Sequence, residues 1–434
     1  SVYLPHYSLY FSRHTSLALA MTRPNFHNAH HTVFPGLGLL AASVTAALLA
    51  GCATTECPPC KEAEKPAAAI QIIKPLKTAK WSDLPGWSDD KTLVEAFPAQ
   101  LQSCNALGKK PAWQEACSAA KALNDAQRKD PSALRAYYQK HYQPYQLVQS
   151  DGASNGLFTG YYEPLLQGAK EQSGKARYPI YGTPPDLLTI ELGDLFPELK
   201  GKRVRGRLTD GNKVIPYWTR EQIEANPSRM HAKTLAWVDD AIELFFLQVQ
   251  GSGRVQMPDG SRLRVGYADQ NGQPYQSIGT VLIKQGALTK DTASMQGIQN
   301  WARNNPAKVQ SLLNANPSYV FFRVLPTDPN NPDAGPPGAL GVPLTPGRSI
   351  AIDPRATPLG APVWLDTTYP NSNKPLQRLV LAQDTGGAIK GAVRADFFWG
   401  FGASAGQEAG RMKQPGQMWA LIPPAAVPAD KVRD

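Results

Sequence analysis

The sequence predicts a mainly β fold with peripheral helices, and three observations support this. After residue 318, short runs of β-branched and aromatic residues alternate with glycine and proline, as in a small closed barrel. Between residues 80 and 146, apolar residues recur instead at helical spacing. Residues 156–290 mix short strands and loops with two short helices. The 434 residues are enough for two or three domains, each with a core of its own.

The first 51 residues are typical of an export signal. From Thr32 to Gly51 no residue is charged, the run Leu37–Ala50 is apolar and built of small residues, and Arg23 lies upstream. The run is short for a membrane span, and no basic cluster follows it. It ends in Leu-Ala-Gly-Cys52, which is similar to a bacterial lipobox, where the cysteine is lipidated and becomes the new N-terminus.

A lipid on Cys52 would anchor the chain without a spanning helix. Ala53 follows, at the position where an aspartate usually signals retention in the inner membrane. The expected location is therefore the periplasmic face of the outer membrane of a Gram-negative bacterium. Met21 is the expected start, which leaves residues 1–20 as upstream sequence. The alternative interpretation of the apolar run is an ordinary buried helix.

Residues 52–79 are expected to form the anchor and a flexible tether. The stretch from residue 57 to residue 69 is polar, proline-rich and without periodicity. Its pair Cys57 and Cys60 has the CxxC spacing of redox and zinc sites, but no βαβ pattern surrounds it and no second pair follows. A periplasmic disulfide is the simpler alternative.

Apolar residues at positions i, i+3 and i+4 predict helices over residues 113–123 and 134–141. His141 is therefore expected to pack on a helix face rather than to bind a ligand. Residues 239–249 have a good N-cap and a glycine stop. The remaining helices are expected at residues 277–285 and at 291–314, where Pro306 interrupts the pattern.

Five short strands are predicted after residue 318, each bounded by glycine or proline. They cover residues 319–324, 349–352, 362–365, 379–382 and 418–422.

The scarcity of histidine and cysteine excludes several kinds of catalysis. Of seven histidines, only His141 and His231 follow residue 52, and all five cysteines lie in the first 117 residues. Metal hydrolases usually need two or three histidine ligands. No metal site and no cofactor are therefore expected, and catalysis must depend on carboxylates, hydroxyls and backbone groups. Cys104 and Cys117 suit an oxidising compartment, where a bridge between them would contribute about 3 kcal/mol.

The densest group of candidate catalytic residues lies between residues 382 and 400. Asp384 and Asp396 are accompanied by Gly386 and Gly387, and glycine lets the backbone approach a ligand closely. Asp396 precedes Phe-Phe-Trp, and an aspartate in apolar surroundings should have a raised pKa, as a general acid needs. The alternative is that Asp384 makes a turn and Asp396 caps a strand. Asp384-Thr-Gly also resembles the aspartic-protease signature, but that chemistry needs two such aspartates.

Seven segments, in the same order, resemble the membrane-bound lytic murein transglycosylase A (MltA) family. Together they extend from about residue 150 to residue 422. They are GLFTGYYEP (156–164), YPIY (178–181), FLQVQGSG (246–253), YQSIGTVLI (275–283), NPSYVFF (316–322), DTGGAIKG (384–391), and Asp396 with Gly400.

The resemblance implies a double-psi β-barrel domain and a smaller β domain inserted into it, with the glycan bound in the groove between them. Mapped onto this sequence, the catalytic barrel with its N-terminal helices would comprise residues 80–164 and 319–434. The inserted substrate-binding domain would comprise residues 165–318.

The resemblance also implies a reaction. Members of the family cleave the β-1,4 bond between N-acetylmuramic acid and N-acetylglucosamine in peptidoglycan and leave a 1,6-anhydro ring, so that they are formally lyases. The family's catalytic aspartate falls on Asp396, its second aspartate on Asp384 and its active-site threonine on Thr159. This chain has one more residue between the aspartates, near Arg394. In an extended segment, that residue would turn side chains to the other face, so we expect a loop to absorb it.

Gln250 and Ser252 of the insert, and Tyr161 of the barrel, are expected to contact the glycan. The alternatives are polar groups that end a helix, for the first two, and core packing for Tyr161 or Tyr162. Expected partners are peptidoglycan strands, the outer membrane and a wall-synthesis complex. The formal net charge of +10 suits acidic peptide stems. Nucleic acid is not expected, because no basic run appears and the chain is exported. A non-catalytic wall-binding lipoprotein and a hydrolytic muramidase remain the alternative functions.

Overall fold

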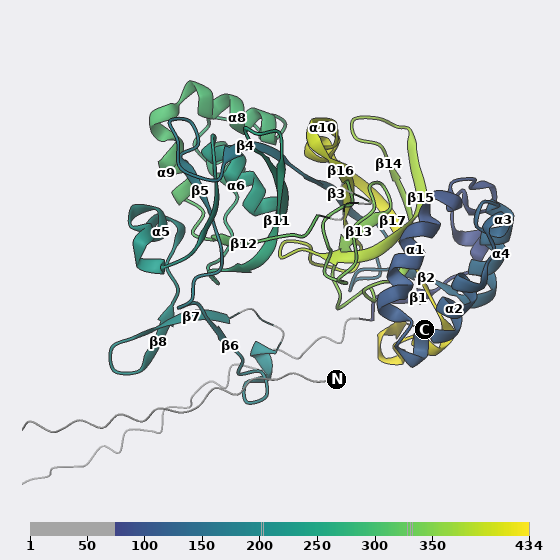
Figure 1. The fold of residues 1–434 in the computed structure, drawn as a ribbon. Helices are drawn as coiled ribbons and strands as arrows, with labels where there is room; N and C mark the ends of the chain where they lie inside the picture. Colours follow the sequence, from purple (N-terminus) through teal and green to yellow (C-terminus); the bar gives the residue numbers. More distant parts are fainter. Residues whose placement is uncertain are drawn as a thin grey trace, which may run out of the picture. The chain divides into compact units, whose positions relative to one another are not determined.

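The computed structural model describes residues 74–433, apart from residues 201, 203, 328, 330 and 332. The export signal, the predicted lipid site Cys52 and the pair Cys57 and Cys60 lie outside the described residues. Within the described part, no helix is long and apolar enough to cross a membrane. Figure 1 shows that strands dominate this part and that helices surround them, which confirms the predicted fold class.

A nine-stranded sheet closes on itself to form a six-stranded barrel (Figure 1). The order is β14-β15-β13-β16-β3-β17-β2-β1-β18, and an additional β14–β17 pairing closes the first six strands into a ring. The β13–β15 and β16–β3 pairs are parallel, and the other pairs of the ring are antiparallel. The barrel strands are β3 (Gly156–Glu163), β13 (Ser349–Ile352), β14 (Pro362–Thr368), β15 (Pro375–Thr385), β16 (Arg394–Phe401) and β17 (Lys413–Ile422), and the outer strands are β1 (Leu76–Thr78), β2 (Gln143–Leu147) and β18 (Val432–Arg433).

A six-stranded and a three-stranded sheet form the second β-rich part. Their orders are β12-β11-β10-β4-β9-β5 and β6-β7-β8. The strands are β4 (Leu165–Ala169), β5 (Tyr178–Tyr181), β6 (Leu188–Ile190), β7 (Val204–Thr209), β8 (Lys213–Pro216), β9 (Thr234–Val238), β10 (Ser252–Gln256), β11 (Arg262–Gln270) and β12 (Val320–Val324).

The strand predicted at residues 319–324 was assigned to the barrel, and this assignment is wrong. As β12 it pairs antiparallel with β11, so it belongs to the six-stranded sheet. An apolar run of five residues specifies a strand but not the sheet that it joins, which depends on pairing with residues distant in sequence.

Helices cover both β-rich parts. Those expected from helical spacing are present, with Asp130, Asp240, Ser277 and Ser294 accepting N-cap hydrogen bonds and Gly251 ending α6 at φ 82°. The helices are α1 (Leu93–Leu107), α2 (Pro111–Ala122), α3 (Asp125–Arg128), α4 (Pro131–His141), α5 (Arg220–Ala225), α6 (Ala241–Gln250), α7 (Ile278–Lys284), α8 (Met295–Asn304), α9 (Val309–Asn314) and α10 (Gly402–Arg411).

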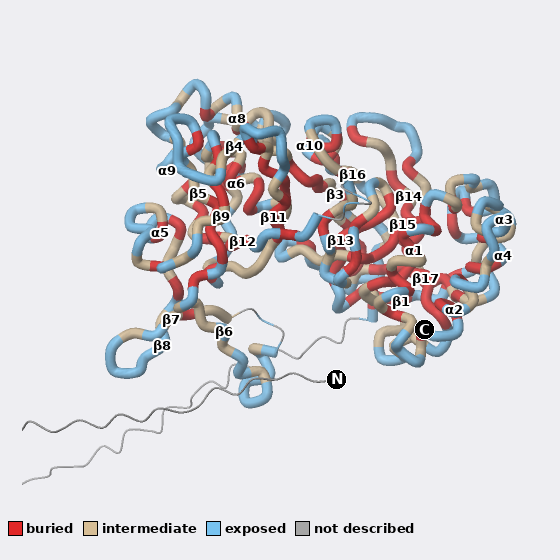
Figure 2. Tube along the Cα trace, viewed as in Figure 1, coloured by how far each residue is buried: buried red, intermediate tan, exposed pale blue. Residues whose placement is uncertain are grey.

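The barrel strands bury both of their faces, and they are mostly red in Figure 2. One set of alternate residues, which includes Phe158 and Phe397, packs into the barrel interior. The opposite set on β14, β15 and β17, which includes Trp364 and Leu381, packs under α1, α2 and α4. These helices cover only the outer face of β14, β15 and β17. The outer face of β13, β16 and β3 does not pack against them.

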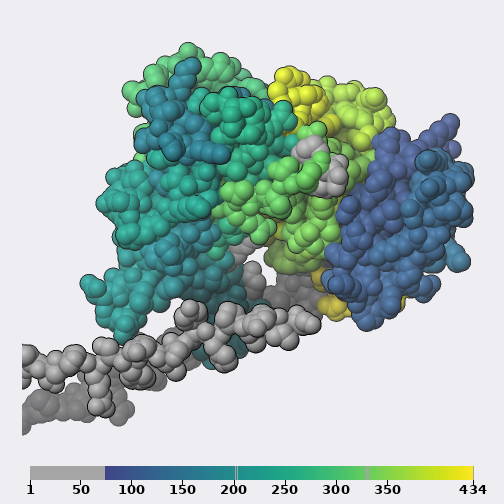
Figure 3. Space-filling model, viewed as in Figure 1, coloured from purple at the N-terminus to yellow at the C-terminus, as the bar shows by residue number. Residues whose placement is uncertain are grey.

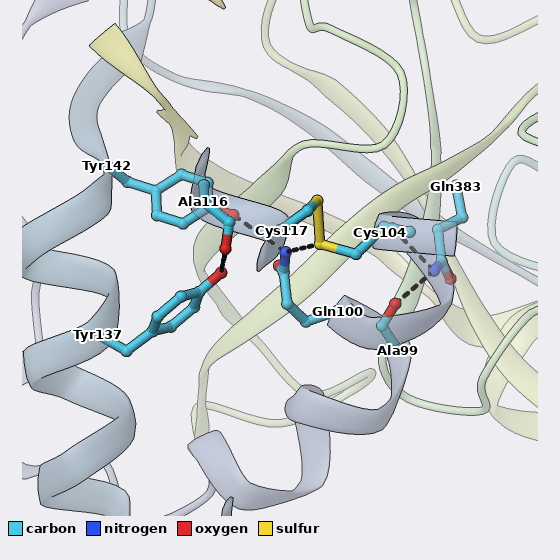
Figure 4. Close-up of a disulfide and its surroundings, with 9 residues drawn as sticks. Ala99, Gln100, Cys104, Ala116, Cys117, Tyr137, Tyr142 and Gln383 are labelled. Carbon is cyan, nitrogen blue, oxygen red and sulfur yellow. Dashed lines mark hydrogen bonds between the residues drawn. A yellow bond between two sulfur atoms is a disulfide. The ribbon is translucent and has the colours of Figure 1, made fainter. Parts of the chain in front are cut away.

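A disulfide joins α1 to α2 near the barrel (Figure 4). Cys104 and Cys117 are both buried, and their Cα atoms are 5.2 Å apart, which confirms the predicted bridge. Gln100 Nε2 lies 3.4 Å from the Cys104 sulfur. One turn away on the same helix, the carbonyl of Ala99 accepts a hydrogen bond of 2.9 Å from Gln383 on β15. The bridged helix pair is therefore tied to the barrel strand that also carries Asp384.

Candidate active site

Strand register places the predicted site residues in one row across the barrel. Asp384 pairs with Ala351, Ala351 pairs with Asp396, and Asp396 pairs with Thr159. Directly paired residues point to the same face of a sheet. Phe397, the next residue along β16, points into the barrel interior. The row therefore lies on the outer face of the barrel, away from α1, α2 and α4, where Asp384, Asp396 and Thr159 are partly exposed.

A β-bulge in β15 brings Asp384 into this row. Between the pairs Ser349–Leu381 and Ala351–Asp384, β15 advances one residue further than β13. Leu381 faces the helices, so strict alternation would have turned Asp384 into the barrel together with Ala382. The extra residue re-aims the carboxylate outward, as bulges often do beside functional sites.

The Asp396 carboxylate lies at the end of a short chain of hydrogen bonds. Thr159 Oγ1 donates to Asp396 Oδ1 over 2.6 Å, and Arg394 donates a 2.9 Å hydrogen bond to Thr159 Oγ1. Arginine has no acceptor, so the hydroxyl proton of Thr159 must point to Asp396. No hydrogen bond from the described residues engages Asp396 Oδ2. Oδ1 is consequently an acceptor, and a proton bound to Asp396 is placed on Oδ2.

Burial raises the pKa of Asp396 from 3.8 to about 6. The hydrogen bond from Thr159 and the charge of Arg394 lower this pKa, while the neighbouring charge of Asp384 raises it. Desolvation outweighs the two stabilising contacts. A carboxyl group with a pKa of about 6 is protonated about a tenth of the time at pH 7, roughly a hundred times more often than one with the ordinary pKa of 3.8, and this raises the supply of the acid form that a general acid needs.

Asp384 is held more tightly than Asp396. Its Oδ1 accepts from the backbone N–H of Ala339 (2.9 Å) and its Oδ2 from the hydroxyl of Tyr161 (3.0 Å). Burial raises the pKa of Asp384, and these donors, together with the Thr385 N–H, lower it. With both oxygens already accepting hydrogen bonds, Asp384 is placed to orient its surroundings rather than to deliver a proton.

Tyr161, which was expected to bind the substrate, has another role here. Its side chain is buried, and its ring packs against Phe398 with the ring centroids 5.1 Å apart. The ring face is thus covered by protein rather than offered to a sugar, and the hydroxyl supports Asp384. Gly386 and Gly387 follow β15 in a turn, in which the Gly386 carbonyl accepts from Ile389 N–H. Their amides make no hydrogen bond to Asp396 among the described residues.

Gln250 and Ser252 lie where the insert meets the barrel. Gln250 is the last residue of α6, and its side-chain carbonyl accepts from the backbone N–H of Tyr162 on β3 (3.1 Å). Ser252 begins β10 and is partly exposed. The structure thus brings Gln250 to the strand that carries Thr159, through a protein contact that sequence reasoning did not foresee.

Sequence reasoning missed two contributors. Arg394 was considered only as the position near the additional residue. On a strand, however, an arginine two positions before an aspartate points to the same face as the aspartate, and this spacing is a signal for a charge partner. Ala339 contributes a backbone N–H from a loop distant in sequence, for which no residue-type signal exists.

The extra residue between the aspartates is absorbed before β16, because the register with β3 is uninterrupted from Arg394 to Phe398. Within the described residues, no group of three or more His, Cys, Asp or Glu side chains could hold a metal ion.

Comparison with known proteins identifies the family. The family model described as the MltA specific insert domain matches residues 157–323, and the 3D domain model matches residues 348–422. The membrane-bound lytic murein transglycosylase A of Vibrio cholerae is 32% identical over 301 residues, which cover 67% of this chain and 71% of that protein.

Solved structures agree with this assignment. MltA from Neisseria gonorrhoeae is 36% identical, with a TM-score of 0.68, over 80% of this chain and 92% of that one. Escherichia coli MltA with bound chitohexaose is 28% identical, with a TM-score of 0.59, over 76% and 90%. The chain belongs to the membrane-bound lytic murein transglycosylase A family.

Proposed function

We propose that the protein is a lytic transglycosylase that cleaves the β-1,4 bond between N-acetylmuramic acid and N-acetylglucosamine in peptidoglycan and forms 1,6-anhydromuramic acid. The observation that carries this proposal is the row of the partly exposed Asp384, Asp396 and Thr159 on the outer face of the barrel, away from α1, α2 and α4. Family membership supports the substrate class, and a relative of known structure binds chitohexaose, an oligosaccharide of linked N-acetylglucosamine. In this proposal the barrel is the catalytic domain, and the six-stranded sheet with its helices binds the substrate.

Asp396 is the proposed general acid. In this proposal the proton is bound to Oδ2, the oxygen that Thr159 leaves available, and the raised pKa increases the protonated fraction near neutral pH roughly a hundredfold. Asp396 gives the proton to the O4 leaving group of N-acetylglucosamine as the glycosidic bond breaks. As a carboxylate it then accepts the proton of the muramic acid C6 hydroxyl, while O6 attacks C1.

A single carboxyl group is sufficient for this reaction. Glycosidases commonly use two, because a nucleophile or an activated water must be supplied. In a lytic transglycosylase the C6 hydroxyl belongs to the sugar under attack, so its high effective molarity replaces the second group. Asp384, with both oxygens held by Ala339 and Tyr161, keeps the local geometry and does not take up or release the proton.

The test is a digest of purified murein sacculi, with the released muropeptides analysed by mass spectrometry. Wild type should release 1,6-anhydro products. Asp396→Asn should lower the rate by roughly 10³, the range of a lost general acid. Asp384→Asn should retain more activity than Asp396→Asn, because it removes an orienting group.

Three outcomes would contradict the proposal. Products with a reducing muramic acid would indicate a hydrolytic muramidase that uses water. Sacculus binding without any released product would indicate a non-catalytic wall-binding protein. Full activity of Asp396→Asn together with loss of activity in Asp384→Asn would transfer the acid role to Asp384.

We also propose attachment to the outer membrane through a lipid on Cys52, which the lipobox-like sequence supports. A Cys52→Ala variant should then appear in the soluble periplasmic fraction instead of the outer membrane. An unchanged membrane fraction would contradict lipidation at this residue.

A further inference from the structure

A polar cavity of about 830 Å³ lies between helices of the insert and the edge of the barrel. We call it the polar groove. One wall comes from α7 and the α7–α8 loop, the other from α10, the start of β17 and the β14–β15 turn. The residues on which the argument depends are Lys290, Asp291, Asn371, Arg411, Lys413 and Gln414.

Contacts beneath the groove join its two walls. The hydroxyl of Tyr162 on β3 lies 3.4 Å from the sulfur of Met295, the first residue of α8. A Cβ on Gly410 of α10 would lie 3.3 Å from the side-chain oxygen of Gln296, so the two helices pass close to one another (Figure 1). On the barrel side, Gln414 donates a 2.7 Å hydrogen bond to Thr368 Oγ1. The groove is therefore a feature of packed elements and not of a loose loop.

Strand register relates the groove to the proposed acid. Lys413 on β17 pairs with Thr159 on β3, and Thr159 pairs with Asp396 on β16. Paired residues share a face, and neighbouring strands lie close to 4.8 Å apart, so the Cα atoms of Lys413 and Asp396 are roughly 10 Å apart. A sugar at Asp396 would thus carry its substituents to the entrance of the groove.

The charges of the groove favour an acidic ligand. Lys290, Arg411 and Lys413 line it and are exposed, and Asp291 is the one carboxylate among the lining residues. N-acetylglucosamine carries no charge, and a muramic acid without a stem has only the single carboxylate of its lactyl group, so a bare strand offers few partners for three cations. The muramic acid of peptidoglycan, in contrast, bears a peptide stem with free carboxylates, and charge-assisted hydrogen bonds to lysine and arginine suit that group.

We infer that the polar groove binds the carboxylates of a peptide stem carried by the muramic acid next to the cleaved bond. This inference rests on the proposed function and extends it from the glycan to the peptide. According to this inference, Arg411 and Lys413 select stem-bearing strands over bare glycan. Asn371 and Gln414, on the same side, supply neutral polar groups for the stem's amides.

The experiment compares two preparations of the same glycan strands, one with stems and one from which an amidase has removed them. The measured quantity is the ratio of kcat/KM for stem-bearing strands to kcat/KM for bare strands. Wild type should favour stem-bearing strands, and Arg411→Ala with Lys413→Ala should lower the ratio by about fivefold, as two partly screened ion pairs would. The ratio cancels any loss that is common to both substrates. The charge-matched control is the double variant Lys121→Ala, Lys129→Ala, which removes two exposed lysines that do not line the groove. It should leave the ratio unchanged.

Raising the salt concentration should lower the wild-type ratio more than that of the Arg411 and Lys413 double variant, because screening acts on the ion pairs and the double variant keeps only Lys290 of the three cations. Association constants of both strand preparations for the Asp396→Asn chain give the same ratio without turnover. If wild type cleaves neither preparation but the ratio of association constants, stem-bearing to bare, falls in the double variant, the proposed reaction fails and the stem site stands. If wild type releases anhydro products and the ratio is the same in wild type and the double variant, the stem site is overturned and the proposed reaction stands.

Discussion

Thr159 and Arg394 together determine which oxygen of Asp396 can hold a proton. A threonine hydroxyl can donate or accept, and alone it would leave the carboxyl free to carry the proton on either oxygen. Arg394 removes this freedom, because it donates to Thr159 and thereby directs the hydroxyl proton to Oδ1. The acid is oriented by a residue that does not itself contact the carboxylate through a hydrogen bond.

The rate of cleavage should depend on pH through Asp396. A general acid acts in its protonated form, and the pKa of Asp396 is raised from 3.8 to about 6. kcat/KM should be flat below that pH and fall about tenfold for each further pH unit above it. An unperturbed aspartate would place the same decline about two units lower. Initial rates on soluble glycan strands between pH 4 and 8 measure it, and an inflection near pH 4 would contradict the raised pKa.

Arg394→Gln should move that decline to higher pH. The positive charge of Arg394 lowers the pKa of Asp396, so removing it raises the pKa further, by up to about one unit. Arg394→Lys keeps the charge and is the matched control, for which the inflection should stay near that of wild type. Thr159→Val removes the hydrogen bond to Oδ1, so it should raise the same pKa and also lower kcat, because the proton is no longer confined to Oδ2. An inflection at the wild-type pH in both Arg394→Gln and Thr159→Val would show that neither contact acts on the acid.

At the scale of elements, the bulge in β15 depends on Gln383. This side chain is fully buried, accepts from Ser349 Oγ on β13 and donates to Ala99 O (2.9 Å) and Ser103 Oγ (3.0 Å) on α1. It thus fixes the extra residue from both sides, and the disulfide of Cys104 holds α1 in turn.

Gln383→Met preserves the approximate volume of the side chain but removes its hydrogen bonds to those three partners. We expect the free energy of unfolding to fall by about 2–4 kcal/mol, as measured by urea denaturation. Activity should fall as well, because Asp384 is the next residue. Gln377→Met on the same strand, where the partly buried amide donates to Asp366, is the control and should cost less than about 1 kcal/mol. Equal losses in both variants would contradict a special role for the bulge.

The sequence predicted elements better than it predicted their partners. Helical spacing located α2, α4 and α6, and glycine and proline bounded β13 and β14, because these signals are local. The bulge at Gln383, the pairing of β12 with β11 and the support of Asp384 by Ala339 N–H depend on contacts between distant residues, which a periodicity does not record. Asp396 became a candidate because it precedes three aromatic residues, and Asp384 because glycines follow it closely, which are both local signals. Their separate roles came only from the family resemblance. The role of Tyr161 was not found, since a tyrosine has the same pattern whether it binds a sugar or a carboxylate.

At the scale of the whole described chain, a buried ion pair joins the barrel to the six-stranded sheet. Glu163 is the last residue of β3, and Arg254 lies on β10, beside the point where the chain crosses from one sheet to the other. Their side chains are 0% and 1% exposed and 2.9 Å apart. Arg254 also contacts Asp333, the carbonyl of Ala334 and the ring of Phe401. The loop before β13 and the end of β16 are thus tied to the same guanidinium. In the space-filling view, the teal and green atoms of the insert meet the yellow-green atoms of the barrel (Figure 3).

The two halves of this pair should not be equivalent. Arg254→Met leaves the Glu163 carboxylate buried without its countercharge, and we expect the free energy of unfolding at pH 7 to fall by about 3–5 kcal/mol. Glu163→Gln should cost less, because Arg254 keeps Asp333, the backbone carbonyl and the aromatic ring. Burial already raises the pKa of Glu163 and Arg254 lowers it, so without the arginine this pKa rises further. Protonation then removes the buried charge, and the deficit of Arg254→Met should shrink as the pH falls from 7 to 5. Urea denaturation at pH 7 and pH 5 measures the free energy of unfolding of each variant. An equal loss of this free energy in the two variants, or a loss in Arg254→Met that does not change with pH, would count against the ion pair as the link between the two sheets.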